Sequence, residues 1–147
     1  MSSTHHSIAL HFVFSTKGRV PSIAAAWRGR LHAFLGGSLR ENGAEPLAVG
    51  GVADHLHLLA GMPATISAAE LMQKVKSISC GWVHGTIGER GFEWQEGYGV
   101  FSVSPPDVDA VRRYIANQEA HHATKSFVGE YREMLKRAGV EYDPRYV

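Results

Sequence analysis

Apolar and polar side chains alternate along four short stretches of the chain, which is the pattern of half-buried β-strands. In the first stretch, every second residue from Ile8 to Phe14 is large and apolar. The stretch around His55 alternates in the same way, with leucines between polar positions. The pattern predicts strands at residues 7–15, 45–52, 55–62 and 98–103.

Between and after these stretches, apolar residues recur every three or four positions, which predicts helices. The first helix covers residues 27–42 and ends at Asn42-Gly43. A second opens at Ser67, where Ser67-Ala68-Ala69-Glu70 has the capping-box pattern. A third begins at Ser104-Pro105 and runs to about residue 122, and a last one covers 127–138 before a glycine. The glycine- and charge-rich stretch 85–97 is expected to be a loop.

The resulting order, β-α-β-β-α-β-α-α, begins with the six elements of the split βαβ arrangement. We therefore expect an α+β, ferredoxin-like fold: an antiparallel sheet with helices on one face, followed by C-terminal helices. The second and third strands are expected to form a hairpin around Ala53-Asp54. The length of 147 residues predicts one domain over residues 1–147. This architecture hosts many functions and selects none.

Composition excludes several classes of protein. Hydrophobic residues make up 44% of the chain and charged residues 20%, as in ordinary globular proteins. The single cysteine, Cys80, excludes an internal disulfide and a cysteine-based zinc cage. With no signal-peptide pattern at Met1-Ser2-Ser3 and no long apolar run, the chain is expected to be cytoplasmic. The net charge of +1 is low for a non-specific nucleic-acid binder.

His55 and His57 are the first candidate for chemistry. They are two residues apart in a predicted strand, so both side chains project from the same face. Two such imidazoles can hold one divalent cation if a third ligand comes from elsewhere in the chain. The alternative is a hydrogen-bonded histidine pair in a polar groove.

Tyr114 and Gln118 form the second candidate, four residues apart on a predicted helix and therefore on one face. A tyrosine hydroxyl is a competent nucleophile toward a phosphodiester. Its ordinary pKa of about 10 means that a metal or cation must assist it at neutral pH. The amide oxygen of Gln118 is a plausible hard ligand for that metal. Taken alone, each residue is equally an ordinary helix residue.

Together these motifs resemble the single-tyrosine HUH transposases of bacterial insertion sequences, a family that includes the repeat-associated tyrosine transposases. The pairing of His-hydrophobic-His on a strand with Tyr-x-x-x-Gln on a late helix is similar to the family's. So are other stretches, in the family's order: Val13-Phe14-Ser15-Thr16-Lys17-Gly18-Arg19, Asp54-His55-Leu56-His57-Leu58-Leu59, Leu71 to Ser79, Trp94 to Ser104 and Tyr114 to His122.

The resemblance implies an enzyme that cleaves single-stranded DNA at the ends of a mobile element and rejoins it through a 5′-phosphotyrosine. Carried over by position, Tyr114 is the nucleophile, and His55, His57 and Gln118 are the metal ligands. The metal is expected to be Mg²⁺ or Mn²⁺. The expected partners are DNA hairpins near the element ends and a second copy of the chain, whose tyrosine helix can complete the site.

Further residues receive weaker assignments. Asp54 is expected to orient a histidine ring as an outer carboxylate, or only to cap the turn. His121 and His122 are interpreted as solvated residues at a helix end, with contact to the metal or the DNA as the alternative. Trp94 and Tyr98 are interpreted as core or base-stacking aromatics. Six cations are candidate phosphate contacts, with the first turn and Lys76 favoured: Lys17, Arg19, Lys74, Lys76, Arg112 and Arg113.

Four alternatives remain beside the transposase. A host-adapted nuclease that processes repeats would use the same residues. A non-catalytic hairpin-binding module would not need Tyr114, His55 and His57 together. An RNA-binding domain of this fold would carry aromatic residues on its central strands, a signature missing here. A metal hydrolase that uses water would tolerate Tyr114→Phe.

Overall fold

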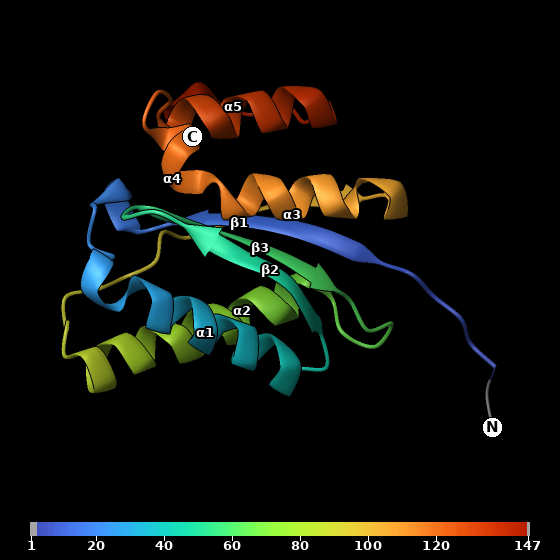
Figure 1. The fold of residues 1–147 in the computed structure, drawn as a ribbon, viewed down its shortest axis with the longest axis horizontal. Helices are drawn as coiled ribbons and strands as arrows, with labels where there is room; N and C mark the ends of the chain where they lie inside the picture. Colours follow the sequence, from blue (N-terminus) through green and yellow to red (C-terminus); the bar gives the residue numbers. More distant parts are fainter. Residues whose placement is uncertain (1–2, 147) are drawn as a thin grey trace.

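A four-stranded antiparallel sheet forms the centre of the protein (Figure 1), and the order of its strands is β2-β3-β1-β4. The computed structural model describes residues 3–146, so Met1, Ser2 and Val147 of the predicted domain lie outside the described residues. The predicted hairpin is confirmed, because β2 pairs with β3. The strands are β1 (Ala9–Ser15), β2 (Glu45–Gly51), β3 (His55–Gly61) and β4 (Gly99–Val103).

Helices cover the sheet on both faces (Figure 1). The layer formed by α1 (Ala25–Glu41) and α2 (Ala68–Trp82) lies on one face, as the ferredoxin-like prediction required. The Ser67 side chain accepts a hydrogen bond from the Glu70 amide, which confirms the predicted cap of α2. The C-terminal helices lie on the other face: α3 (Val108–Ala116), α4 (Gln118–His122) and α5 (Phe127–Ala138).

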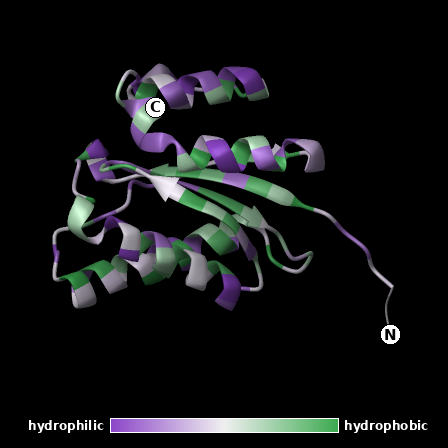
Figure 2. Ribbon diagram, in the orientation of Figure 1, coloured by the Kyte–Doolittle hydropathy of each residue, from purple (hydrophilic) through white to green (hydrophobic). Residues whose placement is uncertain are grey.

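The hydrophobic core lies between the sheet and the α1/α2 layer. Phe12 and Phe14 of β1 and Leu56 and Leu58 of β3 point into it, at alternate positions of each strand. Leucines of α1 and apolar residues of α2 fill the other side. In Figure 2 the central strands are accordingly mainly apolar, and helix α5 is more polar. Within residues 3–146, no helix combines the length and the apolarity that crossing a membrane requires.

All positions of β3 from His55 to Ala60 are buried, because helix α3 covers the face opposite the core. The two-residue period of the strand therefore sends Leu56 and Leu58 into the core and both histidines toward α3. Helix α3 approaches closely because Gly50 of β2 has no side chain. A Cβ built on Gly50 would lie 2.5 Å from the carbonyl oxygen of Ile115 and 2.9 Å from its Cγ2.

The structure differs from the prediction in two segments. The single helix expected over residues 104–122 is a short 3₁₀ turn at Pro105–Asp107 followed by α3 and α4, with a break at Asn117. The φ/ψ values of Asn117, −99° and 21°, are not helical. The backbone N–H of Asn117 donates hydrogen bonds to the carbonyls of both Arg113 and Tyr114, which tightens the turn. The loop expected at 85–97 begins later, because Val83–Ile87 continues α2 as one π-helical turn.

We expect Gly50→Ala to lower the free energy of unfolding by about 1–3 kcal/mol, the usual cost of an added methyl group that cannot be accommodated. The matched control is Gly37→Ala in α1, where a Cβ meets nothing within 4 Å. That change should be neutral or stabilise the helix by up to about 1 kcal/mol. Urea denaturation of both variants tests the close approach, and equal stabilities would contradict it.

Candidate metal centre and nucleophile

His55 and His57 lie side by side on β3, fully buried, with ring centroids 5.2 Å apart. Their Nε2 atoms face the C-terminal helices. The Nε2 of His55 is 3.0 Å from Oε1 of Gln118, so the side chain that the sequence suggested as a third ligand reaches the pair. The Tyr114 ring packs edge-on against the His57 ring, at 5.7 Å between centroids. The structure thus brings all four predicted residues together within one chain.

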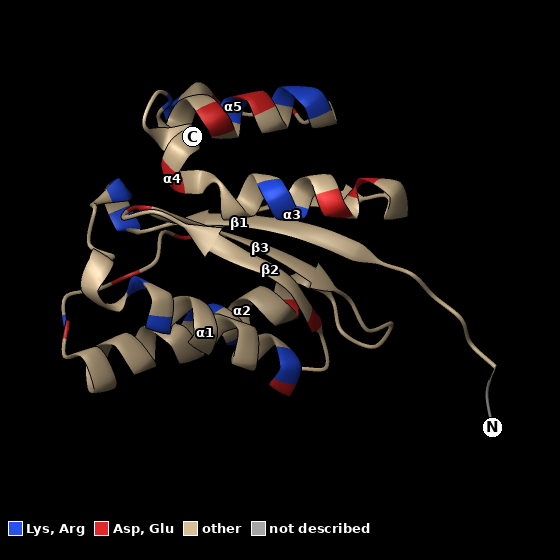
Figure 3. Ribbon diagram, in the orientation of Figure 1, with Lys and Arg blue, Asp and Glu red and all other residues tan. Residues whose placement is uncertain are grey.

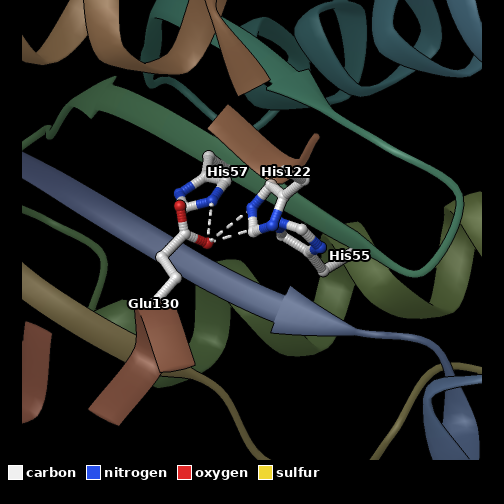
Figure 4. Close-up of side chains that lie close together, drawn as sticks. All are labelled: His55, His57, His122 and Glu130. Atoms are coloured by element: carbon white, nitrogen blue, oxygen red, sulfur yellow. Dashed lines mark hydrogen bonds and ion pairs between the residues drawn. The ribbon is translucent and has the colours of Figure 1, made fainter. Parts of the chain in front are cut away.

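Two further residues enter the same pocket (Figure 4). His122 comes from α4 and Glu130 from α5. The Nε2 of His122 is 3.0 Å from Oε1 of Gln118. Oε1 of Glu130 lies 3.0 Å from Nε2 of His57 and 3.2 Å from Nε2 of His122. His122 is therefore not the solvated helix-end residue that the sequence suggested, since its side chain is only 10% exposed.

The donor set fits a divalent cation. One ligand atom from each of His55, His57, His122 and Glu130 lies within 4.8 Å of the other three. Two ligands about 2.1 Å from one ion and at right angles to each other are about 3.0 Å apart. The observed separations of 3.0–3.3 Å between Oε1 of Glu130 and the three histidine nitrogens are close to that value. Imidazole nitrogens, an amide oxygen and a carboxylate are all ligands of divalent metal ions in proteins.

Outer partners hold the two histidine rings. Oδ1 of Asp54 lies 2.7 Å from Nδ1 of His55, the geometry expected of a carboxylate that orients a ligand. Nδ1 of His57 lies 2.8 Å from Nε2 of His11, a buried residue of β1. When Nε2 of His57 binds a cation, its Nδ1 must carry the proton and donate it to His11. Burial, and then the neighbouring His57, lower the pKa of His11 to about 3, so His11 is neutral and can accept.

The electrostatics of the pocket depend on the buried Glu130. Burial disfavours a charge on His55, yet hydrogen bonds to Asp54, Glu130 and Gln118 outweigh it and raise the pKa of His55 to about 9. Burial also disfavours the Glu130 carboxylate, but His55 and His57 hold the pKa of this group far below its ordinary range. Burial, and then the hydrogen bond to Glu130, raise the pKa of the Tyr114 phenol, so this hydroxyl is protonated. A positive charge in the pocket is therefore favoured.

A model of the IS200-like transposase family matches residues 4–118 of the chain, which include Tyr114, Gln118 and both strand histidines. The chain belongs to this family. The resemblance inferred from the motifs is confirmed, and the protein is a member of a family of DNA-cleaving transposases. The match ends at Gln118, so His122 and Glu130 lie beyond it.

Two solved structures share the transposase fold. A candidate transposase of Deinococcus radiodurans superposes with a TM-score of 0.66 at 22% identity, covering 80% of this chain and 95% of the other. A REP-associated tyrosine transposase, solved with a REP hairpin bound, gives a TM-score of 0.60 at 15% identity, covering 83% and 74%. At these identities the likeness establishes the fold alone. No protein of curated function matches the chain.

Lysines and arginines are distributed over several helices and loops of this transposase (Figure 3). Arg19 is connected to the pocket through Phe127: its guanidinium lies 6.0 Å from the centroid of the Phe127 ring, which stacks on His55 at 4.3 Å. Lys76 donates to the carbonyls of Gln95 and Gly97, at 2.6 and 2.8 Å.

The other four cations lie farther from the pocket or are already paired. Lys17 pairs with Glu93 at 3.0 Å. Arg112 donates to the Leu47 carbonyl at 2.8 Å. Lys74 on α2 and Arg113 on α3 are exposed. Trp94 and Tyr98 pack against the core, as one of their two interpretations predicted.

Sequence reasoning missed His11 and Glu130 and undervalued His122. His11 alternates with core residues on β1, and this placement on the histidine face could have been inferred once β1 was paired with β3. Glu130 gave no such signal, because α5 carries a second acidic residue, Glu133, and most of its residues are polar.

We predict that His11→Phe weakens Mn²⁺ binding by about 10–100-fold, the usual cost of removing the partner of a ligating histidine. The rise of Tm with Mn²⁺ concentration measures the affinity, because a ligand of the native state stabilises it by mass action. His6→Ala, at an exposed position, is the control. An unchanged affinity in His11→Phe would show that His57 needs no such partner.

Proposed function

We propose that the protein cleaves and rejoins single-stranded DNA at the ends of a mobile element, with Tyr114 as the nucleophile and a divalent metal held by His55, His57 and Gln118. One observation carries the proposal. The Tyr114 hydroxyl donates to the same carboxylate, that of Glu130, which contacts the three histidine nitrogens of the pocket. A nucleophilic oxygen beside a metal pocket is the arrangement that phosphodiester transfer requires.

In the proposed reaction the Tyr114 oxygen attacks the phosphorus of the scissile phosphodiester. A bond from phosphorus to the tyrosine oxygen forms as the bond from phosphorus to the 3′ oxygen breaks. The phenol loses its proton, and the departing 3′ oxygen gains one and leaves as a hydroxyl. Attack of a 3′ hydroxyl on the phosphotyrosine reverses these steps and rejoins the strand, so no external energy source is needed.

The surroundings of the pocket support this chemistry. His55 and His57 are held on a strand whose other face is packed into the core, so the ligands are fixed before substrate arrives. Mg²⁺ or Mn²⁺ bound there would polarise the scissile phosphate and stabilise the charge on the departing oxygen. A cavity of about 510 Å³ beside Tyr114, lined in part by His11, Phe101 and Arg137, gives the hydroxyl access to a substrate.

The proposed substrate is single-stranded DNA that carries a hairpin, in keeping with the REP hairpin bound by the solved transposase of this fold. Dimerisation stays a prediction. A second copy whose tyrosine helix completes the site is part of that prediction. The runner-up is a host-adapted protein of the same fold that binds hairpins or processes repeats.

The test is a cleavage assay on a hairpin-bearing single-stranded oligonucleotide taken from DNA that flanks the gene. With Mn²⁺ we expect a covalent protein–DNA adduct on a denaturing gel, which is lost with chelator and in Tyr114→Phe. Tyr142→Phe, outside the pocket, should form the adduct at the normal rate. Cleavage without an adduct that survives Tyr114→Phe would identify water as the nucleophile. Binding without cleavage would favour the hairpin-binding protein.

Among the candidate phosphate contacts, Arg19 is expected to matter most because its guanidinium lies over the Phe127 ring, which stacks on His55. We predict that Arg19→Ala weakens binding of the oligonucleotide. The slope of log K against log salt concentration should become shallower by about 1, because one phosphate contact is lost. Arg40→Ala, an exposed change at the end of α1, is the control. Binding curves at several salt concentrations make the comparison, and equal slopes for Arg19→Ala and wild type would rule out the contact.

A further inference from the structure

Glu130 is the most unusual side chain of the protein. It comes from the mainly polar helix α5, yet it is only 2% exposed. A buried carboxylate destabilises a protein unless partners compensate for its lost hydration. Glu133, one turn later on the same helix, is exposed and pairs with Lys125. The sequence gives no reason for the difference between the two acids.

The two oxygens of Glu130 have separate sets of partners. Oε1 faces the metal pocket, at 3.0 Å from Nε2 of His57 and 3.3 Å from Nε2 of His55. Oε2 faces the nucleophile: it accepts from the Tyr114 hydroxyl and from the Gln118 amide, the latter at 3.1 Å, and it lies 3.3 Å from Nε2 of His121. One carboxylate therefore bridges the candidate metal ligands and the hydroxyl that is proposed to attack.

Helix α5 is anchored so that this bridge is fixed. Phe127 stacks on the His55 ring, and Ser126 caps the helix by accepting from the Gly129 amide at 3.1 Å. On the next turn, the Tyr131 ring packs closely on Gly99 of β4: a Cβ built on Gly99 would lie only 2.7 Å from Cε1 of that ring. The helix is thus held at the pocket and at β4, with Glu130 between these two contacts.

The charge of the ligand set gives a second argument. His55, His57 and Gln118 are neutral when they bind a cation, whereas Mg²⁺ and Mn²⁺ favour carboxylate oxygens. Glu130 is the acidic side chain of the cluster whose ligand atoms lie within 4.8 Å of one another. A hard divalent cation in this pocket therefore has its best ligand on α5, beyond the part of the chain that the family model matches.

We infer that Glu130 is a ligand of the metal through Oε1, and that through Oε2 it holds the Tyr114 hydroxyl beside that metal. Helix α5 then completes the active site by coupling the position of the nucleophile to the metal. The inference rests on the proposed function and adds to it a carboxylate ligand that also contacts the reacting oxygen.

The first test measures binding of Mn²⁺ alone by calorimetric titration, without DNA. Glu130→Gln keeps the shape of the side chain and removes its charge, and we expect it to weaken Mn²⁺ binding at least about tenfold. Glu133→Gln on the same helix should bind Mn²⁺ like the wild type, because its side chain is exposed and is not a proposed ligand. Unfolding in chelator shows whether each variant is folded.

If Glu130→Gln does not fold, Glu130→Asp serves instead, since it keeps the charge and shortens the reach by one methylene. It should also weaken Mn²⁺ binding. A purely structural ion pair would change the stability in chelator and leave the Mn²⁺ affinity of the folded variant unchanged.

The second test separates the two oxygens. At Mn²⁺ concentrations that saturate each variant, Glu130→Gln should form the tyrosine adduct about tenfold or more slowly. With the single amide oxygen on the metal, the NH₂ group faces the Tyr114 hydroxyl and cannot accept its hydrogen bond. Adduct formation at the wild-type rate would overturn the contact with the nucleophile. Faster adduct formation with unchanged Mn²⁺ affinity would show that Glu130 blocks the site.

Mn²⁺ binding by His57→Ala, measured beside Glu130→Gln, shows whether the inference about Glu130 fails alone or together with the proposed metal centre. If His57→Ala loses Mn²⁺ binding and Glu130→Gln does not, Glu130 is not a ligand and the proposed metal centre stands. If neither variant loses it, Mn²⁺ binds elsewhere and both the inference and the proposed metal ligands are wrong.

Discussion

The central strand β3 is covered on both faces, and its two-residue period governs the rest of the structure. Leu56 and Leu58 are held in the core against α1 and α2, so His55 and His57 must face α3. A shift of one residue in the pairing with β1 would exchange these two sets and bury the histidines in the hydrophobic core. The packing of the core therefore fixes the direction of the proposed metal ligands.

Placing polar groups in a buried pocket has a cost, which the residues of this pocket offset for one another. His55 and Glu130 would each lose charge if buried alone, yet together they hold opposite charges in close contact. A cation bound among the Nε2 atoms would take over the balancing role of the proton on His55. The pocket is thus electrostatically suited to a positive charge, and the polar contacts within it hold α5 on the sheet.

The break at Asn117 has a functional consequence. If the helix were unbroken, residues 118 and 122 would lie on a continuation of the α3 axis. The break lets α4 turn, and Gln118 and His122 both reach the pocket from a separate axis. Close packing of α3 on Gly50 places Tyr114 near the same point. Two local features of the backbone therefore bring the nucleophile and the ligands together.

The sequence by itself determined the ferredoxin-like order of elements and the strand face shared by His55 and His57, because periodicity is a local property of the chain. The approach of Tyr114 and Gln118 to those histidines was implied only by the resemblance to the transposase family. It did not reveal Glu130, His11 or the burial of His122. An acid on a polar helix looks the same whether that helix is solvated or docked. The docking of α5, like the pairing that sets His11 beside His57, depends on contacts between residues tens of positions apart, and only the tertiary structure decided them.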